Sequence, residues 1–354
     1  MNNRQVFYLM FYSIMSTAVL TLPVILGKNA PRDAWLDAIL FLPFALLVAW
    51  LTAKLGSKFP SQTIVEYSQR ILGKWLGLLC TVILLAWTIH TTSIVYREAS
   101  EFTDTTLLGS TPFAIIMILV SVPSTYAVYK GLEVIGRMAD FLFYIIFFSI
   151  TLIYALLFPE YRFEELLPIL SDGWRNILLG LPALLAYTGE TVILLFVFPN
   201  FTSPNKTGKT LIGMLLLVSL LGVVTETAHT MVFGVERKMI NLPFYHMARL
   251  ITLGGILERV DTLFVLSSLL AVILKISFYT YICAIGSARL FKTNDHKPFI
   301  LPLVIIMNLL GLYSFSTVPQ MVDFLSNIWP IFSLPVELGI PSLLLLVASL
   351  RKIT

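Results

Sequence analysis

Two charged side chains fall in the middle of otherwise apolar stretches of the chain. Glu190 interrupts residues 178–198, and Lys275 interrupts residues 261–289. A charged side chain at the centre of a membrane helix costs about 2.5–3.5 kcal/mol on insertion scales. Each charge therefore needs an internal partner, a ligand or a coupling ion. Their similar depths allow a direct or water-bridged pair, or separate contacts with the carboxylate and the amine of a zwitterion.

The residues next to Glu190 are small or polar, although they stand in mid-span. They read Tyr187, Thr188, Gly189 and Glu190. Such a run is typical of a discontinuous membrane helix, whose freed backbone groups are tolerated only against protein, water or a ligand. We expect these four residues to form a substrate-binding site at a break in this helix.

Further polar residues at helical depth could complete that site. Ser16 and Thr17 stand where the first span either opens or continues with its hydroxyls bonded to its own backbone. Thr91 belongs to a threonine stripe that serves either as contact between helices or as a cavity wall. Glu226, in the outer third of its span, either reaches toward the surface or lines a vestibule. Together with Glu190 and Lys275, it is a candidate for ion or proton coupling.

The sequence gives no sign of a catalytic or metal centre. Cys80 and Cys283 fall inside apolar stretches, where cysteine packs as a small hydrophobic residue. The histidines lack the spacing and the cysteine partners of a metal site. There is no glycine-rich nucleotide loop and no set of nucleophile, base and orienting group. We therefore expect no enzyme activity, no cofactor and no metal.

The composition indicates a membrane protein with many spans. Hydrophobic residues make up 57% of the chain and charged residues 12%, against about 25% charged residues in an ordinary soluble domain. Windows of about 20 apolar residues mark membrane helices. They predict an all-α protein with a single transmembrane domain, 1–354, and ten spans near residues 5–26, 34–54, 75–97, 111–129, 134–157, 178–198, 210–233, 261–289, 298–317 and 331–350.

The loops predict how the chain is oriented. Lys and Arg are more frequent in the loops on the side of the N-terminus, which predicts that both termini are cytoplasmic. The first span runs directly into the second, so we interpret it as a retained helix and not as a cleaved signal. The net charge of +4 is accounted for by this asymmetry, and no nucleic-acid partner is expected.

The segments between the spans carry four further expectations. Residues 56–77 predict a short amphipathic helix on the cytoplasmic face. Residues 241–255 predict a helix that lies over the outer face as a lid. The acidic residues of 97–106 and 159–176 are expected in outward loops, either solvated or as a docking surface. The last two spans are interpreted as scaffold.

Four segments together resemble a known family. They are NNRQVFYLMFYSIMSTAVLTLP, KFPSQTIVEYSQRILGKWLG, AYTGE followed by LFVFPNF, and LAVILKISFYTY. In order and spacing they are similar to the B subunit of bacterial spore germinant receptors, the endospore germination permease family. That family belongs to the amino acid, polyamine and organocation transporter superfamily.

The resemblance implies a five-plus-five inverted repeat, with residues 5–157 as the first repeat and 178–350 as the second. It also implies that helices one and six are discontinuous around a central pocket. Ser16 and Thr17 match the unwound part of helix one, residues 187–190 match that of helix six, and Lys275 matches the lysine of helix eight.

By the same resemblance, the chain is expected to sense a small nutrient, often an L-amino acid, in the spore inner membrane. Its partners would be a larger A-type membrane subunit and a C-type lipoprotein. Two alternatives remain at this stage. One is a proton-coupled amino acid transporter that needs the same pocket, and the other is a channel-forming or assembly scaffold without saturable ligand binding.

Overall fold

The computed structural model describes residues 1–251 and 260–353. Within those ranges every regular element is helical. The ten expected spans are confirmed, because ten helical stretches of the described chain are long and apolar enough to cross a membrane. In order they comprise α1 (Asn3–Asn29); η1 (Ala34–Leu36), α2 (Asp37–Leu40) and α3 (Leu42–Lys58); α5 (Lys74–Thr103) and η2 (Asp104–Leu108); α6 (Phe113–Lys130); α7 (Leu132–Leu156); α8 (Trp174–Thr188) and η5 (Gly189–Phe196); η7 (Pro204–Lys206), α9 (Thr207–Phe233) and η8 (Gly234–Met239); α11 (Val260–Leu290); α12 (Lys297–Ser314); and α13 (Val318–Asp323), η9 (Phe324–Ile328), α14 (Trp329–Leu334), η10 (Pro335–Gly339) and α15 (Ile340–Leu350).

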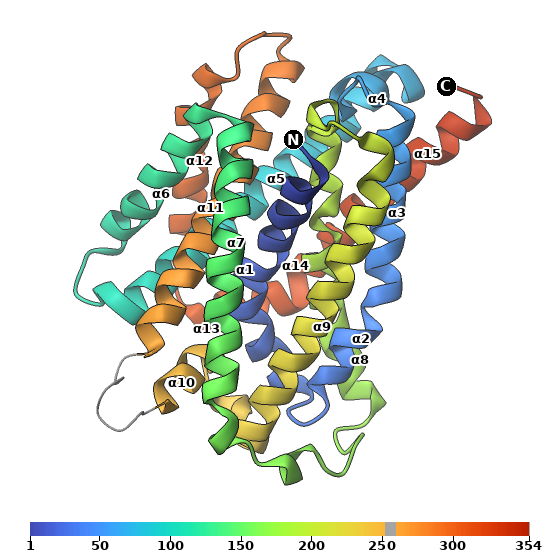
Figure 1. The fold of residues 1–354 in the computed structure, drawn as a ribbon. Helices are drawn as coiled ribbons and strands as arrows, with labels where there is room; N and C mark the ends of the chain where they lie inside the picture. The colour runs from blue at the N-terminus through green and yellow to red at the C-terminus, as the bar shows by residue number, and fades with distance from the viewer. Residues whose placement is uncertain (252–259, 354) are drawn as a thin grey trace.

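The first span forms the centre of the bundle. Helix α1 packs against α7, α8, α9 and α11, and Figure 1 shows it in dark blue between these neighbours. Its most apolar window is 89% buried inside the protein. Its hydroxyl side chains at Ser13, Ser16, Thr17 and Thr21 are better placed among other helices than against lipid, so burial by neighbouring helices is its stable position. The site residues on α1 are therefore presented to the interior of the protein.

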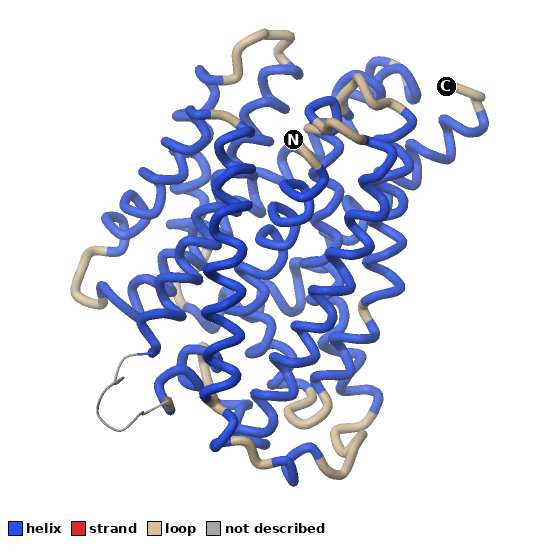
Figure 2. The backbone as a smooth tube through the Cα atoms, viewed as in Figure 1, coloured by secondary structure: helices blue, strands red, loops and turns tan. Residues whose placement is uncertain are grey.

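The ends of the chain lie on the same side of the bundle. Figure 1 shows both termini, α4 (Ile64–Leu72) and the loop between α11 and α12 at one end, and α10 (Pro243–Leu250) at the other. Figure 2 shows most connecting loops gathered at these two ends. An even number of spans places both termini on one side of the membrane, and the structure has them at the same end of the bundle.

The two spans expected to be discontinuous differ in the structure. The sixth changes from α-helix to 3-10 helix at Gly189, as expected. For the first, the structure has the continuous alternative, since α1 runs as one helix past Ser16 and Thr17. Ser13 finds a partner without opening the backbone, because its hydroxyl donates to the carbonyl of Leu9 at 2.8 Å. No glycine marks a break in the middle of α1.

The expected amphipathic helix is confirmed as α4. Thr63 and Glu66 form a capping box at its start. The backbone N–H of Glu66 donates a hydrogen bond to the Thr63 side chain, and the backbone N–H of Thr63 donates one to the Glu66 carboxylate at 2.5 Å. The expected lid helix is present as α10, which packs against α1, α9 and α11. Residues 252–255 of that expectation lie outside the described part of the chain.

Candidate binding site at the centre of the helix bundle

The break in the sixth span depends on a close contact at Gly189. A β-carbon added there would lie 2.1 Å from Oε2 of Glu337. Immediately before it, the Thr188 hydroxyl donates to the carbonyls of Leu184 at 3.0 Å and Leu185 at 3.1 Å. Hydroxyls bonded to the preceding turn tend to bend helices. The glycine thus allows the tenth span to approach, and the helix continues as 3-10 from this point.

The change of helix type places Glu190 against Lys275. The Lys275 ammonium lies 2.9 Å from Oε2 and 3.2 Å from Oε1 of Glu190, and it also donates to the Thr17 hydroxyl at 2.9 Å. The Tyr279 hydroxyl donates to the same carboxylate. Lys275 and Glu190 are only 1% and 2% exposed. Of the two arrangements left open by the sequence, the structure has the direct pair.

A second polar cluster lies beside this pair. Glu98 on α5 accepts the hydroxyl of Thr21 at 2.5 Å and that of Tyr187 at 3.1 Å. The ring of Tyr187 also faces the Lys275 ammonium, which lies 5.9 Å from the ring centroid. This distance is within the range of cation–π attraction. Tyr187 therefore connects the two clusters, one through its hydroxyl and the other through its ring.

The space between the clusters is small in this conformation. The cavity there has a volume of about 10 Å³, close to the minimum that holds one water molecule. A larger cavity of about 180 Å³ lies farther toward the end of the bundle that carries α10, and Asn241 and Leu242 contribute to its wall. Glu98 lines both cavities. The structure is thus closed around the central site, and this acid stands between the two spaces.

Five of the predicted site residues meet at the small cavity, and four do not. Those that line it are Thr17, Thr91, Tyr187, Glu190 and Lys275. Gly189 and Thr188 support the break but do not line the cavity. Ser16 lines a separate space of about 30 Å³ between α1, α7 and α11, and its hydroxyl has no partner among the described residues. Of its two predicted roles Thr91 has that of cavity wall, since it lines the cavity and donates its hydroxyl within its own helix, to the carbonyl of Trp87 at 2.8 Å.

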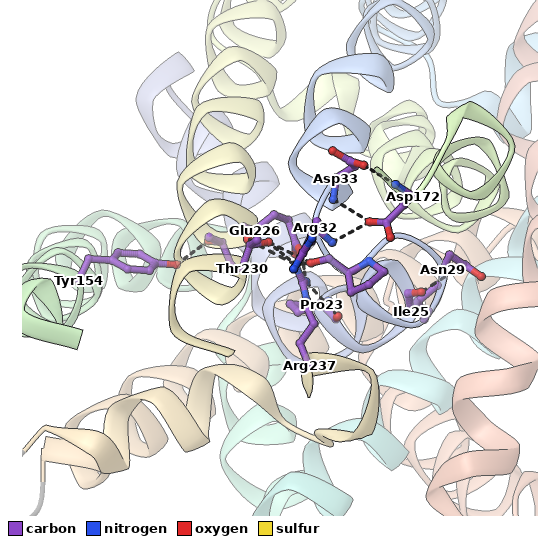
Figure 3. A network of polar contacts seen from close by, with 12 residues as sticks. Pro23, Ile25, Asn29, Arg32, Asp33, Tyr154, Asp172, Glu226, Thr230 and Arg237 are labelled. Atoms are coloured by element: carbon purple, nitrogen blue, oxygen red, sulfur yellow. Dashed lines mark hydrogen bonds and ion pairs between the residues drawn. The ribbon is translucent and has the colours of Figure 1, made fainter. Parts of the chain in front are cut away.

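Glu226 belongs to a different network, near the end of α1 that lies away from the termini. Its carboxylate pairs with Arg237, whose guanidinium also donates to the Thr230 hydroxyl at 3.1 Å and to the carbonyl of Pro23 at 3.3 Å. Figure 3 shows these side chains together. Glu226 is 3% exposed. It does not reach the surface; it lines a separate space of about 40 Å³ between α1, α8 and α9, and neither of the two cavities that Glu98 lines. Its predicted role in ion coupling has no contact with Lys275 to support it.

Sequence reasoning missed three central residues, Glu98, Glu337 and Tyr279. Residues 97–106 were expected in a solvated loop, which is wrong for Glu98: α5 continues to Thr103 and buries this acid. The signal was its spacing, because Thr91 and Glu98 are seven residues apart and share one helix face. Glu337 was assigned to scaffold, although its charge in an apolar span has the same cost as that of Glu190.

Replacing Gly189 by alanine is expected to destabilise the protein by about 1–3 kcal/mol, the usual cost of overpacking. The new β-carbon would lie 2.1 Å from Oε2 and 3.1 Å from Cβ of Glu337, and both groups are held in the interior. Thermal unfolding of the purified protein measures this effect. Gly339→Ala is the matched control, since nothing lies within 4 Å of a β-carbon there. Equal stability of the two variants would contradict the expectation, and Glu337→Ala should partly rescue Gly189→Ala.

Comparisons with known proteins agree with this architecture. The family described as "Spore germination protein" matches residues 1–318. Spore germination protein KB of Bacillus subtilis is 25% identical and is matched over 99% of this chain and 94% of its own length. Spore germination protein YndE of the same organism is 26% identical, and the match covers 96% of this chain and 93% of that protein.

Two solved structures share the fold at low identity. MhsT in complex with L-phenylalanine has a TM-score of 0.67 and 13% identity, over 96% of this chain and 97% of that one. A Na⁺-coupled sialic acid symporter has a TM-score of 0.67 and 11% identity, and the match covers 97% of this chain and 78% of the symporter. At these identities the likeness shows the fold alone, a transporter fold with which the expected inverted repeat and the discontinuous sixth span agree. The chain therefore belongs to the spore germination protein family, and it shares the fold of these solved transporters.

Proposed function

We propose that this protein is the membrane subunit of a spore germinant receptor and that it binds a small nutrient, an L-amino acid, at the central site. The observation that carries this proposal is the buried pair of Lys275 and Glu190 at the break of the sixth span. A buried ion pair is weak evidence for stability, because its desolvation offsets much of the attraction. Its presence at a helix break supports a binding role better than a structural one.

The charges of the site match those of a zwitterion. The Lys275 ammonium can bind a carboxylate, and the carboxylates of Glu190 and Glu98 can bind an ammonium. A ligand of this kind would substitute for the direct pair, so neither protein charge would be left without a partner. The hydroxyls of Thr17 and Thr21 already bond to these groups and can orient them.

Binding must also change the conformation of the protein. The central cavity of about 10 Å³ holds at most one water molecule, so an amino acid fits only after the helices separate. A ligand shifts an equilibrium between two states by its difference in affinity for them. Stabilising the expanded state is therefore a means by which this subunit could signal to its partners.

The partners we propose are an A-type membrane subunit and a C-type lipoprotein, in the spore inner membrane and with both termini of this chain cytoplasmic. Family membership supports this assignment. The expected acidic docking surface keeps residues 159–176, where Glu160 and Glu164 are exposed, and the half-buried Glu101 and Asp104 of the first segment. Glu98 is not available to a partner, because it is buried.

Ligand binding to the purified full-length chain in nanodiscs tests the proposal. The probes are the L-amino acids, with their D-enantiomers and common sugars for comparison. We expect saturable binding of an L-amino acid, and about tenfold weaker binding to Thr17→Val, because a hydrogen bond to a charged group contributes about 1.5–3 kcal/mol. Thr151→Val is the control, since that exposed hydroxyl bonds only to its own helix. Absence of saturable binding by any amino acid would overturn the assignment of the ligand.

The second candidate function is proton-coupled amino acid transport. The shared fold with solved transporters and the buried carboxyl groups of the central site favour it. Uptake of the bound amino acid into proteoliposomes under a pH gradient separates the two functions. A sensor binds the ligand without net flux, whereas a transporter accumulates it.

A further inference from the structure

Glu337 is a fully buried carboxyl group that lines neither of the two cavities beside Glu98. It lies in η10, a π-helical segment of the tenth span, and is 0% exposed. Neither of its oxygens has a hydrogen-bond partner among the described residues. One-turn π-helical segments within α-helices are frequent at functional sites. The position of this acid therefore requires an explanation beyond packing.

The charges around Glu337 do not balance its own. Its electrostatic neighbours are Glu190 in η5 and Lys275 and Tyr279 in α11. The Lys275 ammonium bonds directly to Glu190, so one ammonium faces two carboxyl groups. An ionised carboxylate without a donor in a dry interior costs several kcal/mol, whereas a neutral polar group costs far less. The protonated carboxyl is therefore the less costly form of Glu337 while the site is closed.

The other elements packed against η10 supply no compensating cation. Segments α14 and α15 contain no titratable side chain. On α5, the ring of His90 stacks on Trp329 of α14, with centroids 5.8 Å apart. On α3, the Lys54 ammonium lies over the exposed ring of Trp50, and Lys58 lies at the end of the helix.

The carboxyl group also touches the point where the sixth span changes its geometry. Gly189 leaves no room for a β-carbon beside Oε2 of Glu337, and η5, which begins at this glycine, packs directly on η10. Any movement of η5 away from the tenth span uncovers the carboxyl group. Water can then solvate its charged form, which the closed packing excludes.

We propose that Glu337 is a proton-binding site that couples protonation to the packing of the sixth span. While η5 covers it, the carboxyl group keeps its proton. When η5 moves away, the O–H bond breaks, water accepts the proton and the carboxylate remains hydrated. Closure then requires that the proton return. This site goes beyond the proposed nutrient binding and does not depend on it.

A cysteine reporter in η5 tests the proposal without any ligand. Thr191 is suitable, because it is 0% exposed and its hydroxyl has no partner in the described structure. Thr191→Cys is made in full-length protein in which Cys80 and Cys283 are replaced by alanine. The measurement is the rate of labelling by a water-soluble thiol reagent at several pH values, with Glu337 present and with Glu337→Gln, whose neutral amide mimics the protonated acid.

The ratio of the two rates separates the effect of Glu337 from the intrinsic reactivity of the thiol. If opening releases one proton, the labelling rate with Glu337 present, divided by the rate with Glu337→Gln, rises by up to about tenfold per pH unit. Glu133→Gln, at an exposed ion pair with Arg137, is the control and should leave the pH dependence unchanged. The same pH dependence with and without Glu337 overturns the proposal.

A second measurement does not rely on the folding of one variant. The infrared spectrum of the purified wild-type protein at neutral pH should contain the carbonyl band of a protonated carboxylic acid. In Glu337→Gln this band should lose the contribution of one carboxylic acid. In Glu337→Asp, whose shorter side chain moves the carboxyl group away from Gly189, the frequency of that contribution should shift. Unchanged spectra in both variants overturn the proposal. Failure to bind amino acids would leave these results unaffected, so the two proposals fail independently.

Discussion

Replacing Lys275 by methionine is expected to destabilise the protein by about 3–5 kcal/mol, the usual cost of removing one partner of a buried ion pair. The substitution leaves the Glu190 carboxylate with the Tyr279 hydroxyl as its remaining donor. The same change removes the cation that we propose for the ligand carboxylate. Thermal unfolding measures the first effect, and amino acid binding by the purified protein measures the second.

Two further variants separate charge from packing. In Lys275→Met/Glu190→Gln, both charges are absent, and stability should recover most of the loss, since apolar or neutral replacements of a whole buried pair are often neutral or stabilising. Lys130→Met is the control, because this lysine is exposed at the end of α6. A single Lys275→Met variant as stable as the wild type would contradict the expectation. In spores with normal subunit levels, a normal nutrient response of both Glu190→Gln and Lys275→Met would contradict the proposed function.

The central pair could be predicted from the sequence because its cost is local. Any charge in an apolar stretch is expensive wherever the helix lies in the bundle. Glu190 and Lys275 could therefore be recognised without knowledge of the packing. Their agreement in depth followed from the rise of 1.5 Å per residue. That they contact each other directly could not be predicted, because it depends on how α8 and α11 are arranged around α1.

Glu98 was missed because hydropathy windows locate the apolar part of a helix and not its end. The third span was expected to end near residue 97, yet α5 continues to Thr103. Its last turns remain inside the protein, where neighbouring helices supply hydrogen-bond partners for polar side chains. Thr21 and Tyr187, which bond to Glu98, lie 77 and 89 residues away in the chain. Only the tertiary structure brings these residues together.

The first span shows a second limit of sequence reasoning. Its hydroxyls are compatible with an opened helix and with a continuous one, and they use different partners in the structure. The Thr17 hydroxyl accepts a hydrogen bond from the Lys275 ammonium, whereas Ser16 lines the separate space between α1, α7 and α11. The division into repeats at 5–157 and 178–350 stays a prediction.

Arg237 lies in η8, directly after α9, and is only 1% exposed. Its guanidinium pairs with Glu226 and donates to the carbonyls of Pro23 and Pro31, both at 3.3 Å. A β-carbon at Gly27 would lie 2.7 Å from its Nε atom. It therefore joins the end of α1, the loop that follows and α9 (Figure 3).

Arg237→Met is expected to destabilise the protein by about 3–5 kcal/mol, because Glu226 would remain buried without its cation. Arg237→Lys should restore only part of this loss, since an ammonium cannot reproduce the planar fork of donors that reaches several acceptors at once. Thermal unfolding and amide hydrogen exchange at residues 23–31 measure the two consequences, global stability and the fixation of this end of α1.

The matched control is Arg137→Met, which breaks an ion pair with Glu133 whose side chains are 73% and 72% exposed. Exposed pairs contribute about 0–1 kcal/mol, so this variant should unfold close to the wild-type temperature. If Arg237→Met behaves like Arg137→Met, the buried guanidinium does not hold the helix end. If Arg237→Met/Glu226→Gln recovers stability but not hydrogen-exchange protection, the charge accounts for the energy. The hydrogen bonds to the carbonyls of Pro23 and Pro31 then account for the position of α1.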